Sequence, residues 1–239
     1  MKLKTVEVKN VLRCEELFDN LNSRSAIVEG IGLVHGPSGF GKTTTMTWLF
    51  NQDHVDAIYV RCRATDTPSS LLTKIAFEMG LDPKYPLGRM VDDIVENMRH
   101  KELSLFVDEV DYVIGSARIM ESLRDIYDLT QQPVLLIGMD QIARRISHRK
   151  QLFNRISEWI EFQPADFEDV ALFADELLEN EIRLEEDLLE AVQRKANGEV
   201  RRILSALEKI ERKAIAAQRD KISLDDVDIR EIFLDSRRR

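Results

Sequence analysis

The sequence predicts an α/β fold: a five-stranded parallel sheet with helices on both faces, followed by a smaller group of C-terminal helices. Up to Gln163, short apolar runs alternate with amphipathic segments of helical period, a pattern typical of a parallel sheet covered on both faces. Beyond Gln163 the period is helical throughout. We therefore expect a lead-in segment (residues 1–25), an α/β nucleotide-binding domain (26–163) and a C-terminal helical region (164–239).

The expected strands are short apolar segments, several of them rich in β-branched and aromatic residues. The first strand follows a lead-in segment with one short helix around residues 14–21, and it precedes a glycine-rich loop. The five strand segments are 31–35, 56–62, 103–107, 133–138 and 158–162.

The expected helices of the α/β domain have recognisable ends. Thr67 supplies a hydroxyl cap and Pro68 the first turn of a helix that Gly80 ends. Amphipathic helices follow at 88–100 and 117–130.

The helices expected beyond residue 163 are 167–180, 185–197, 200–218 and 223–234. Asn197 and Gly198 form a helix stop, and Ser223 caps the last helix after a linker over residues 220–223. The basic tail 237–239 is expected to fray.

The loop after the first strand matches the pattern G-x-x-x-x-G-K-[ST] at every fixed position. A strand, a glycine loop and a helix N-terminus make an anion cradle, because backbone N–H groups and the positive end of the helix dipole converge there. Lys42 would reach the β- and γ-phosphates of ATP, and the Thr43 hydroxyl would hold Mg²⁺. The predicted nucleotide-binding residues of this segment are Gly36, Pro37, Ser38, Gly39, Phe40, Gly41, Lys42, Thr43 and Thr44.

A second chemical signal follows the third expected strand, which ends in Asp108 and Glu109. Two adjacent carboxylates at the C-terminal end of an apolar strand form the Walker B arrangement, and the crevices of parallel sheets lie at that edge. We expect Asp108 to bind Mg²⁺ together with Thr43, and Glu109 to polarise the attacking water. Asp111, just beyond, is expected to be a solvated or capping residue.

Composition and charge limit the class of protein to which the chain can belong. No apolar run approaches the ~20 residues needed to span a bilayer, and the N-terminus lacks an apolar signal core, so we expect a cytoplasmic protein without a membrane partner. The two cysteines and four histidines show no metal-ligand spacing. The net charge of −9 argues against a simple basic DNA-coating protein.

The charges are unevenly distributed. Residues 166–199 contain twelve acidic and three basic residues, whereas residues 142–155 contain five basic residues and no acidic one. Such asymmetry suits a surface that meets a polyanion, or a basic edge that meets the acidic edge of a neighbouring protomer. The residues predicted to contact DNA are Arg144, Arg145, Arg149 and Lys150, together with Arg61 and Arg63 after the second strand.

The glycine loop, the Walker B pair, five alternating strands and a C-terminal helical lid together resemble the AAA+ ATPases. The resemblance implies an arginine finger shortly before the fifth strand, here Arg155 with Arg149 as the alternative, that completes hydrolysis in a neighbouring subunit. It also implies a sensor-2 arginine, here Arg201 in Gly198-Glu199-Val200-Arg201, with Arg202 as its rival.

One position departs from the family pattern. The fourth strand of AAA+ proteins usually ends near a small polar residue, whereas this chain has Gly138-Met139-Asp140. Asp140 is the polar residue at this place, but an acidic side chain beside phosphate is electrostatically unfavourable without the metal. The family pattern therefore does not assign the sensor-1 residue of this chain or the speed of hydrolysis.

Within the AAA+ class, the amino-acid sequence of residues 30–45 and 137–156 looks like that of the transposition regulators of the phage Mu B-protein and TnsC/TniB type. That resemblance implies a homo-oligomer, ring or helical filament, that assembles with ATP on double-stranded DNA without sequence preference. It also implies a transposase as partner, which the protein recruits or activates.

Three alternatives remain open at this point. The first is an AAA+ ATPase of the replication-initiator or secretion type with a different client. The second is a nucleotide-gated scaffold that does not hydrolyse ATP. The third, a small-molecule P-loop kinase, fits less well, because such kinases usually lack a carboxylate directly after the Walker B aspartate and a lid that begins with G-x-x-R.

Overall fold

The computed structural model describes residues 1–179 and 182–233, and the chain divides into two compact units. The sheet unit consists of residues 13–37 and 42–162. The helical unit consists of residues 1–12, residues 38–41 and the described chain from Gln163 onward. Helix α1 (Lys9–Ser23) and the glycine loop therefore contribute residues to both units.

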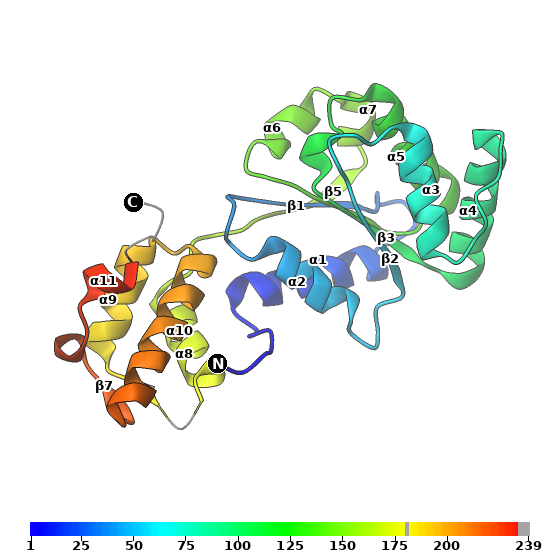
Figure 1. Cartoon of the computed structure of the whole chain (residues 1–239). Helices are drawn as coiled ribbons and strands as arrows, with labels where there is room; N and C mark the ends of the chain where they lie inside the picture. The colour runs from blue at the N-terminus through cyan, green and yellow to red at the C-terminus, as the bar shows by residue number, and fades with distance from the viewer. Residues whose placement is uncertain (180–181, 234–239) are drawn as a thin grey trace. The chain divides into compact units, whose positions relative to one another are not determined.

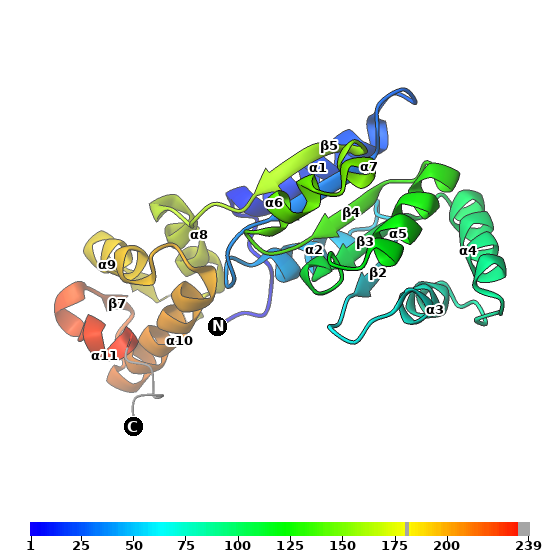
Figure 2. The ribbon, with the colours of Figure 1, turned by 90° about the horizontal axis from the view of Figure 1, so that it is seen from above.

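Five parallel strands form the sheet, in the spatial order β2-β3-β4-β1-β5 (Figure 2). Their bounds are β1 (Ile31–His35), β2 (Ala57–Arg61), β3 (Ser104–Asp108), β4 (Val134–Ile137) and β5 (Ile156–Glu161). The inner strands β3 and β4 are buried along their whole length, because strands covered on both faces have no solvent side. The predicted α/β class with five parallel strands is confirmed.

Strand order brings three loops to one edge of the sheet. Because β4 lies between β1 and β3, the C-terminal ends of these three strands stand side by side. These ends lead into the glycine loop, Gly138 and the Asp108–Glu109 pair. Ligands of open α/β sheets bind outside the carboxyl ends of the strands, so this edge is where a site is expected.

Helices cover both faces of the sheet (Figure 1). Helix α2 and the sheet-unit part of α1 lie on one face, where a Cβ at Gly32 would lie 2.8 Å from Leu21 and 3.0 Å from Leu17 of α1. The other helices of this unit lie on the opposite face. The helices of the unit after α1 are α2 (Lys42–Phe50), α3 (Pro68–Glu78), α4 (Leu87–Lys101), α5 (Ala117–Thr130), α6 (Ile142–Ser147) and α7 (Lys150–Phe153), with a short 3₁₀-helix η1 (Val110–Tyr112).

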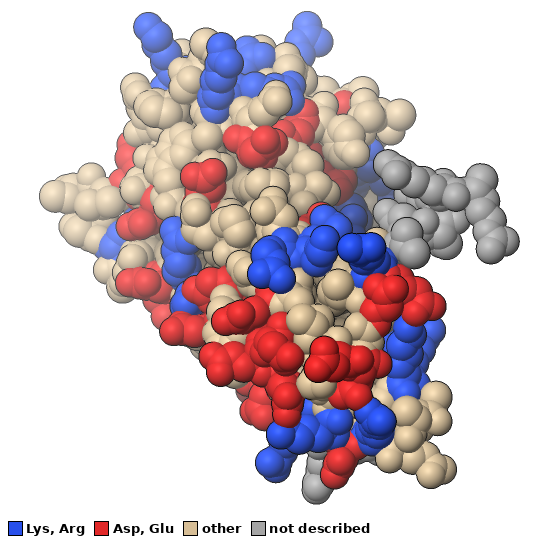
Figure 3. Space-filling model, turned by 90° about the vertical axis from the view of Figure 1, so that its left-hand side faces the viewer, with Lys and Arg blue, Asp and Glu red and all other residues tan. Residues whose placement is uncertain are grey.

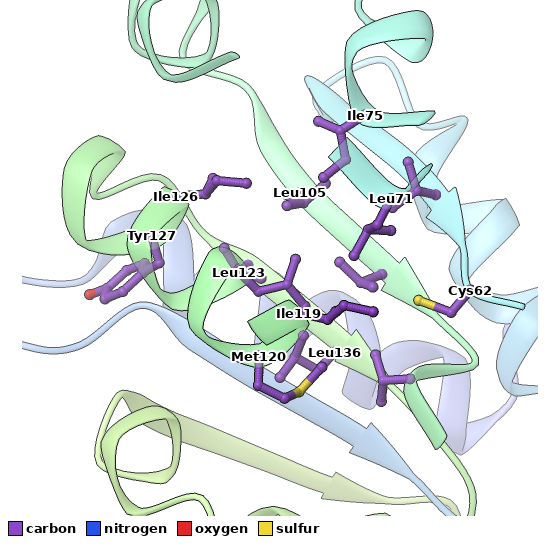
Figure 4. Close-up of a cluster of buried hydrophobic side chains, with 14 of the residues drawn as sticks. Cys62, Leu71, Ile75, Leu105, Ile119, Met120, Leu123, Ile126, Tyr127 and Leu136 are labelled. Atoms are coloured by element: carbon purple, nitrogen blue, oxygen red, sulfur yellow. The ribbon is translucent and has the colours of Figure 1, made fainter. Parts of the chain in front are cut away.

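The main core lies between the sheet and helices α3, α4 and α5 (Figure 4). Leu105 and Leu136 of the sheet, Ile75 of α3 and Ile126 of α5 are fully buried in it. Tyr127 of α5 is also buried in this cluster, and its hydroxyl donates to Glu29 at 2.8 Å. This packing supports the strands whose C-terminal ends carry the candidate site.

Capping residues and hydrophobic periodicity predicted the ends of several helices correctly. Thr67 caps α3 by accepting a hydrogen bond from the backbone N–H of Ser70 at 3.2 Å, and Pro68 is the first residue of the helix. Helix α5 begins at Ala117 and ends at Thr130, as the periodicity predicts. The basic segment before β5, for which the periodicity predicted no element, forms α6 and α7.

The helical unit contains α8 (Phe167–Leu177), α9 (Glu186–Ala196), α10 (Val200–Ala217) and α11 (Ile229–Phe233), a parallel strand pair β6 (Arg183–Leu184) and β7 (Lys221–Ile222), and a 3₁₀-helix η2 (Leu224–Asp226). Helices α9 and α10 agree with the expected segments to within two residues. The helix predicted over residues 167–180 ends earlier, at Leu177, because Leu178 is extended with φ −67° and ψ 143°. Asn180 and the tail 237–239 lie outside the described residues.

The prediction of a continuous last helix over residues 223–234 is wrong. Ser223 does form a capping box with Asp226, but the turn that it caps is only the 3₁₀-helix η2. Val227 then adopts an extended conformation with φ −136° and ψ 136°, so the helical path ends and α11 begins afresh. The segment predicted as a linker, residues 220–223, instead contributes β7, because Ile222 pairs with Leu184. Leu234 lies outside the described residues.

None of the helices described is both long and apolar enough to cross a membrane.

Candidate functional site

The glycine loop joins β1 to α2, and Lys42 is the first residue of the helix. Gly36 lies against the backbone of Phe162, where a Cβ would come within 3.2 Å of both the nitrogen and the oxygen of that residue. Gly39 has φ +85°, a conformation that favours glycine, and a Cβ there would lie 2.4 Å from Oε1 of Glu199. The glycines thus allow a tight loop directly before a helix N-terminus, whose first N–H groups lack intrahelical partners.

Lys42 is buried at the start of α2, with 8% of its surface exposed. Its Nζ donates to the carbonyl oxygens of Gly36 at 2.7 Å and Pro37 at 2.8 Å. Burial lowers the pKa of Lys42, and the nearby Asp108 carboxylate opposes this shift. The lysine ammonium therefore lies within the glycine loop and is bound there by neutral carbonyls, which an anionic ligand can replace.

Asp108, at the end of β3, is 2% exposed and accepts three hydrogen bonds. The Thr43 hydroxyl donates to its Oδ2 at 3.0 Å, and the Tyr59 hydroxyl donates to the same oxygen at 2.7 Å. The backbone N–H of Glu109 donates to Oδ1 at 2.7 Å. Burial and then the Asp108 charge raise the pKa of Tyr59, so this phenol remains a donor. Both carboxylate oxygens are thereby held in place.

Tyr59 was not among the residues identified from the sequence. It lies on β2, and its contact with Asp108 depends on the pairing of β2 with β3, in which Tyr59 lies opposite Phe106. A tyrosine in an apolar strand gives no sign of this contact in its spacing. Only the neighbouring positions of the two strands in the sheet bring the residues together.

Glu109 adopts a left-handed backbone conformation with φ 57° and ψ 39°. Its carboxylate forms an ion pair with Arg61 at the end of β2, and the side chains of Arg61 and Glu109 are 59% and 31% exposed. The proposed catalytic carboxylate is therefore bound to an arginine that the sequence analysis assigned to DNA contact.

Asp111 lies in η1 and connects the ends of β3 and β4. Its Oδ2 accepts a hydrogen bond from the backbone N–H of Met139 at 2.6 Å, and its carbonyl accepts one from Arg145 at 3.2 Å. A Cβ at Gly138 would lie 2.8 Å from the same Oδ2, so the position before Met139 has no room for a side chain. Asp140, the acidic residue of the segment 138–140 at the sensor-1 place, is exposed. Asp111 thus acts as a capping residue, which the sequence analysis left open.

The donor set at the end of β3 suits Mg²⁺. The Thr43 hydroxyl and the Asp108 carboxylate supply hard oxygen atoms on two different elements, and Mg²⁺ is usually bound by one or two such groups together with substrate phosphates and water. Within the described ranges, no group of three or more His, Cys, Asp or Glu residues forms a dedicated metal cage. The residues present therefore fit a metal that arrives with a phosphate ligand.

The two candidate arginine fingers are both engaged within the chain. Arg155 donates through Nε to Asp128 Oδ1 at 2.7 Å and through Nη2 to Asp128 Oδ2 at 3.0 Å. Arg149 donates to the carbonyl oxygens of Ile114 at 3.2 Å and Gly115 at 2.8 Å. Arg155 directly precedes β5, so it lies at the amino edge of the parallel sheet, opposite the edge that carries the site. It cannot act on the site of its own chain.

The basic residues of α6 and α7 differ in their availability. Arg144 and Lys150 are exposed, whereas Arg145 and Arg149 donate to the segment after Glu109. Arg63 is exposed, and its backbone N–H donates to Asp66 at 2.7 Å. These residues therefore do not form one uniform basic strip.

In the helical unit, the backbone N–H of Arg201 donates to Gly39 of the glycine loop at 3.0 Å. The Arg201 side chain is exposed at the start of α10. Its rival Arg202 lies over the ring of Phe233, with 5.4 Å between the guanidinium carbon and the ring centroid. The guanidinium of Arg202 therefore contacts an aromatic ring of its own unit.

Comparisons with known proteins agree with this geometry. A family model described as an AAA domain matches residues 27–146, which include Lys42, Thr43, Asp108 and Glu109. A comparison with curated proteins finds no match.

Three solved structures show the likeness of the fold. The Aeropyrum pernix ORC2 protein in ADPNP–ADP complexes is 17% identical with a TM-score of 0.71, over 96% of this chain and 68% of that one. The Aeropyrum pernix ORC1 protein in complex with DNA is 18% identical with a TM-score of 0.62, over 93% and 63%. Domain III of the Thermotoga maritima replication initiation protein DnaA is 17% identical with a TM-score of 0.58, over 93% and 89%. Identities this low show the fold alone.

The family match covers just over half of the chain and contains the glycine loop, Lys42 and both carboxylates at the end of β3. The chain therefore belongs to the AAA domain family.

Proposed function

We propose that this protein is an ATP-dependent DNA-binding AAA+ ATPase that oligomerises on duplex DNA and regulates or recruits a DNA transposase. The observation that carries the nucleotide part is the 3.0 Å hydrogen bond between Thr43 and Asp108. It joins the first turn of the helix after the glycine loop to the end of β3. A hydroxyl and a carboxylate placed together beside an anion cradle suit a Mg²⁺–nucleotide complex.

Lys42 is the proposed phosphate-binding cation. Its ammonium exchanges two neutral carbonyl partners, Gly36 and Pro37, for the β- and γ-phosphates. The carbonyls carry only partial negative charge whereas the phosphate oxygens carry full charges, so the exchange adds a charge–charge attraction at a buried ammonium. The N–H groups at the start of α2 add further positive potential.

Thr43 and Asp108 would hold Mg²⁺, and the ion when bound neutralises the charge that develops on the phosphates. Asp108 is already oriented by the Tyr59 hydroxyl and by the backbone N–H of Glu109, so this carboxylate needs little reorganisation on binding. Glu109 then orients the attacking water and accepts its proton. Its carboxylate has to leave Arg61 first, because one carboxylate cannot serve both partners in the same position.

Hydrolysis also depends on a neighbouring subunit. Arg155 lies at the opposite edge of the sheet from Lys42, so it can reach only the nucleotide of another protomer. An arginine supplied in this way stabilises the transition-state charge and is worth about 10³–10⁵ in rate in related phosphoryl-transfer enzymes. Head-to-tail contacts of this kind generate either rings or open filaments. The bidentate pair with Asp128 must open for Arg155 to act.

DNA binding is proposed to require assembly. The net charge is −9, and Figure 3, which faces the C-terminal helices, shows many acidic side chains over that unit. Of the six basic residues predicted to contact DNA, only Arg144, Lys150 and Arg63 are exposed without an ion pair in the described part of the chain, so the attraction of a single protomer to DNA is weak. Protomers lined up along one phosphate backbone add their contacts. Phosphate contacts carry no base information, so little sequence preference is expected. The likeness in fold to an ORC1 protein in complex with DNA supports this part.

The transposase as client is supported by the sequence around the glycine loop and before β5, which looks like that of transposition regulators. A second candidate is a replication initiator, which the likeness to the ORC2 protein and to DnaA domain III favours. The two candidates share the nucleotide site and differ in the partner. Stimulation of ATP hydrolysis by a transposase, and not by a replicative helicase, would favour the first.

Negative-stain electron microscopy tests the proposal. With ATP and duplex DNA, the wild-type protein should form rings or filaments on the DNA, whereas with ADP it should remain dispersed. Lys42→Ala, which removes the cation at the phosphates, should remain dispersed in both nucleotides. Identical particles under all three conditions would contradict the proposed function.

A further inference from the structure

We propose that Tyr59 is a positioning residue for the metal-binding carboxylate Asp108, and that it sets the Mg²⁺ concentration at which the site works. This inference rests on the proposed nucleotide site. It concerns a residue on β2, outside the glycine loop and outside the Asp108–Glu109 pair.

Asp108 accepts hydrogen bonds on both of its carboxylate oxygens. Oδ2 accepts from two hydroxyl groups, Thr43 at 3.0 Å and Tyr59 at 2.7 Å, and Oδ1 accepts from the backbone N–H of Glu109 at 2.7 Å. Thr43 is itself a proposed metal ligand, and its hydroxyl has to adapt when the metal binds. The Tyr59 hydroxyl is not a proposed ligand and therefore remains a fixed donor to Oδ2 in both states.

Two aromatic rings hold the ring of Tyr59 in place. Its ring packs edge-on against Phe50 of α2, with 5.8 Å between centroids, and against Phe106 of β3, with 6.4 Å. Strand β2 is in register with β3, where Tyr59 lies opposite Phe106. A phenol held by a strand and two rings orients its hydroxyl more firmly than a water molecule or a flexible side chain would. Groups that hold a metal ligand from outside the coordination shell typically contribute a factor of about 10–100 to metal affinity or activity.

Two residues of β2 contact the Asp108–Glu109 pair in different ways. Tyr59 and Arg61 are two residues apart, so they lie on the same face of the strand. Tyr59 donates to Asp108, and Arg61 pairs with Glu109. The neutral hydroxyl leaves the charge of Asp108 available to a cation, whereas the arginine neutralises Glu109. The two contacts therefore have opposite consequences: one prepares a metal ligand, and the other occupies a catalytic carboxylate.

The test is Tyr59→Phe, which removes one oxygen atom and keeps the ring in its aromatic cluster. Tyr127→Phe is the matched control, because the Tyr127 hydroxyl also donates to a carboxylate, Glu29 at 2.8 Å, at the opposite edge of the sheet. For each protein, a fluorescent ATP analogue is titrated first in EDTA and then against Mg²⁺. Mn²⁺ binding is measured directly by electron paramagnetic resonance, and melting temperatures report folding.

We expect Tyr59→Phe to bind the analogue in EDTA within about twofold of wild type and to need about tenfold more Mg²⁺ or Mn²⁺ for half-saturation. ATP hydrolysis should recover at high Mg²⁺. Tyr127→Phe should titrate with Mg²⁺ like wild type even if its melting temperature falls more.

An unchanged Mg²⁺ requirement in Tyr59→Phe, or an equal shift in Tyr127→Phe, would overturn the positioning role while leaving the nucleotide site intact. A wild-type protein that binds no nucleotide at any Mg²⁺ concentration would refute the proposed function itself, and the role of Tyr59 with it.

Discussion

Replacing Arg61 by glutamine tests whether the ion pair with Glu109 restrains hydrolysis. The Arg61 side chain is 59% exposed and that of Glu109 is 31% exposed, so water screens the pair. Exposed ion pairs contribute about 0.2–1 kcal/mol, and 1.4 kcal/mol corresponds to a tenfold change in an equilibrium. Loss of the pair should therefore raise the population of released Glu109 by about 1.4- to 5-fold. ATP hydrolysis in the absence of DNA should rise by the same factor.

Arg63→Gln is the matched control for this experiment. Arg63 is also an exposed arginine after β2, and both residues were assigned to DNA contact, but no ion pair joins Arg63 to Glu109 among the described contacts. Steady-state phosphate release without DNA should rise for Arg61→Gln and stay at the wild-type level for Arg63→Gln. A rate that falls in Arg61→Gln, or a rise in Arg63→Gln of the same size, would refute the reasoning that Arg61 restrains the catalytic carboxylate.

Three further predictions follow from the same contacts. Glu109→Gln should bind ATP within about twofold of wild type but hydrolyse it at least about 100-fold more slowly, because the proton acceptor is lost; an unchanged turnover would exclude Glu109 from catalysis. Arg155→Ala should bind ATP normally and hydrolyse it about 10³-fold more slowly, and mixing it with Lys42→Ala should restore part of the rate at shared interfaces; no recovery at any mixing ratio, with assembly intact, would exclude Arg155 as a finger in trans. The hydrogen bond from Lys9 lowers the pKa of Asp166, so this pair stabilises the helical unit above the ordinary aspartate pKa and the stabilisation is lost as the pH falls through the lowered value. Asp166→Asn, which keeps a capping side chain, should therefore show a weaker decrease in melting temperature on acidification than wild type, and an identical acid dependence would contradict this.

The fold class was predictable because its signals are local. Apolar strands, helix caps such as Thr67 and helix stops such as Gly80 each act within a few residues, and the structure has these elements within a few residues of the expected ends. The last helix was mispredicted because helical period alone does not register competing partners. Ile222 pairs with Leu184, nearly forty residues earlier in the chain, and no local pattern indicates that contact.

The candidate site likewise contains residues that a local pattern identifies and residues that only the strand order brings to it. Lys42, Thr43 and Asp108 belong to short patterns whose chemistry is evident from their spacing. Tyr59 and Asp111 reach the site only through the strand order β2-β3-β4, which the sequence pattern does not specify. Cross-strand contacts of this kind depend on which strands become neighbours. Residues that position a catalytic group from an adjacent strand are therefore the part of a site that a single sequence conceals.

The central claim is that ATP gates DNA binding, and fluorescence anisotropy of a labelled duplex tests it most directly. The wild-type protein is titrated onto the duplex with ATP and with ADP over a series of salt concentrations, with Lys42→Ala as the nucleotide-deficient control. We expect tight binding with ATP, weak binding with ADP and weak binding for Lys42→Ala, and an affinity with ATP that falls steeply as salt increases. Equal binding with ADP, salt-independent binding, or no binding with ATP at low salt would contradict the account.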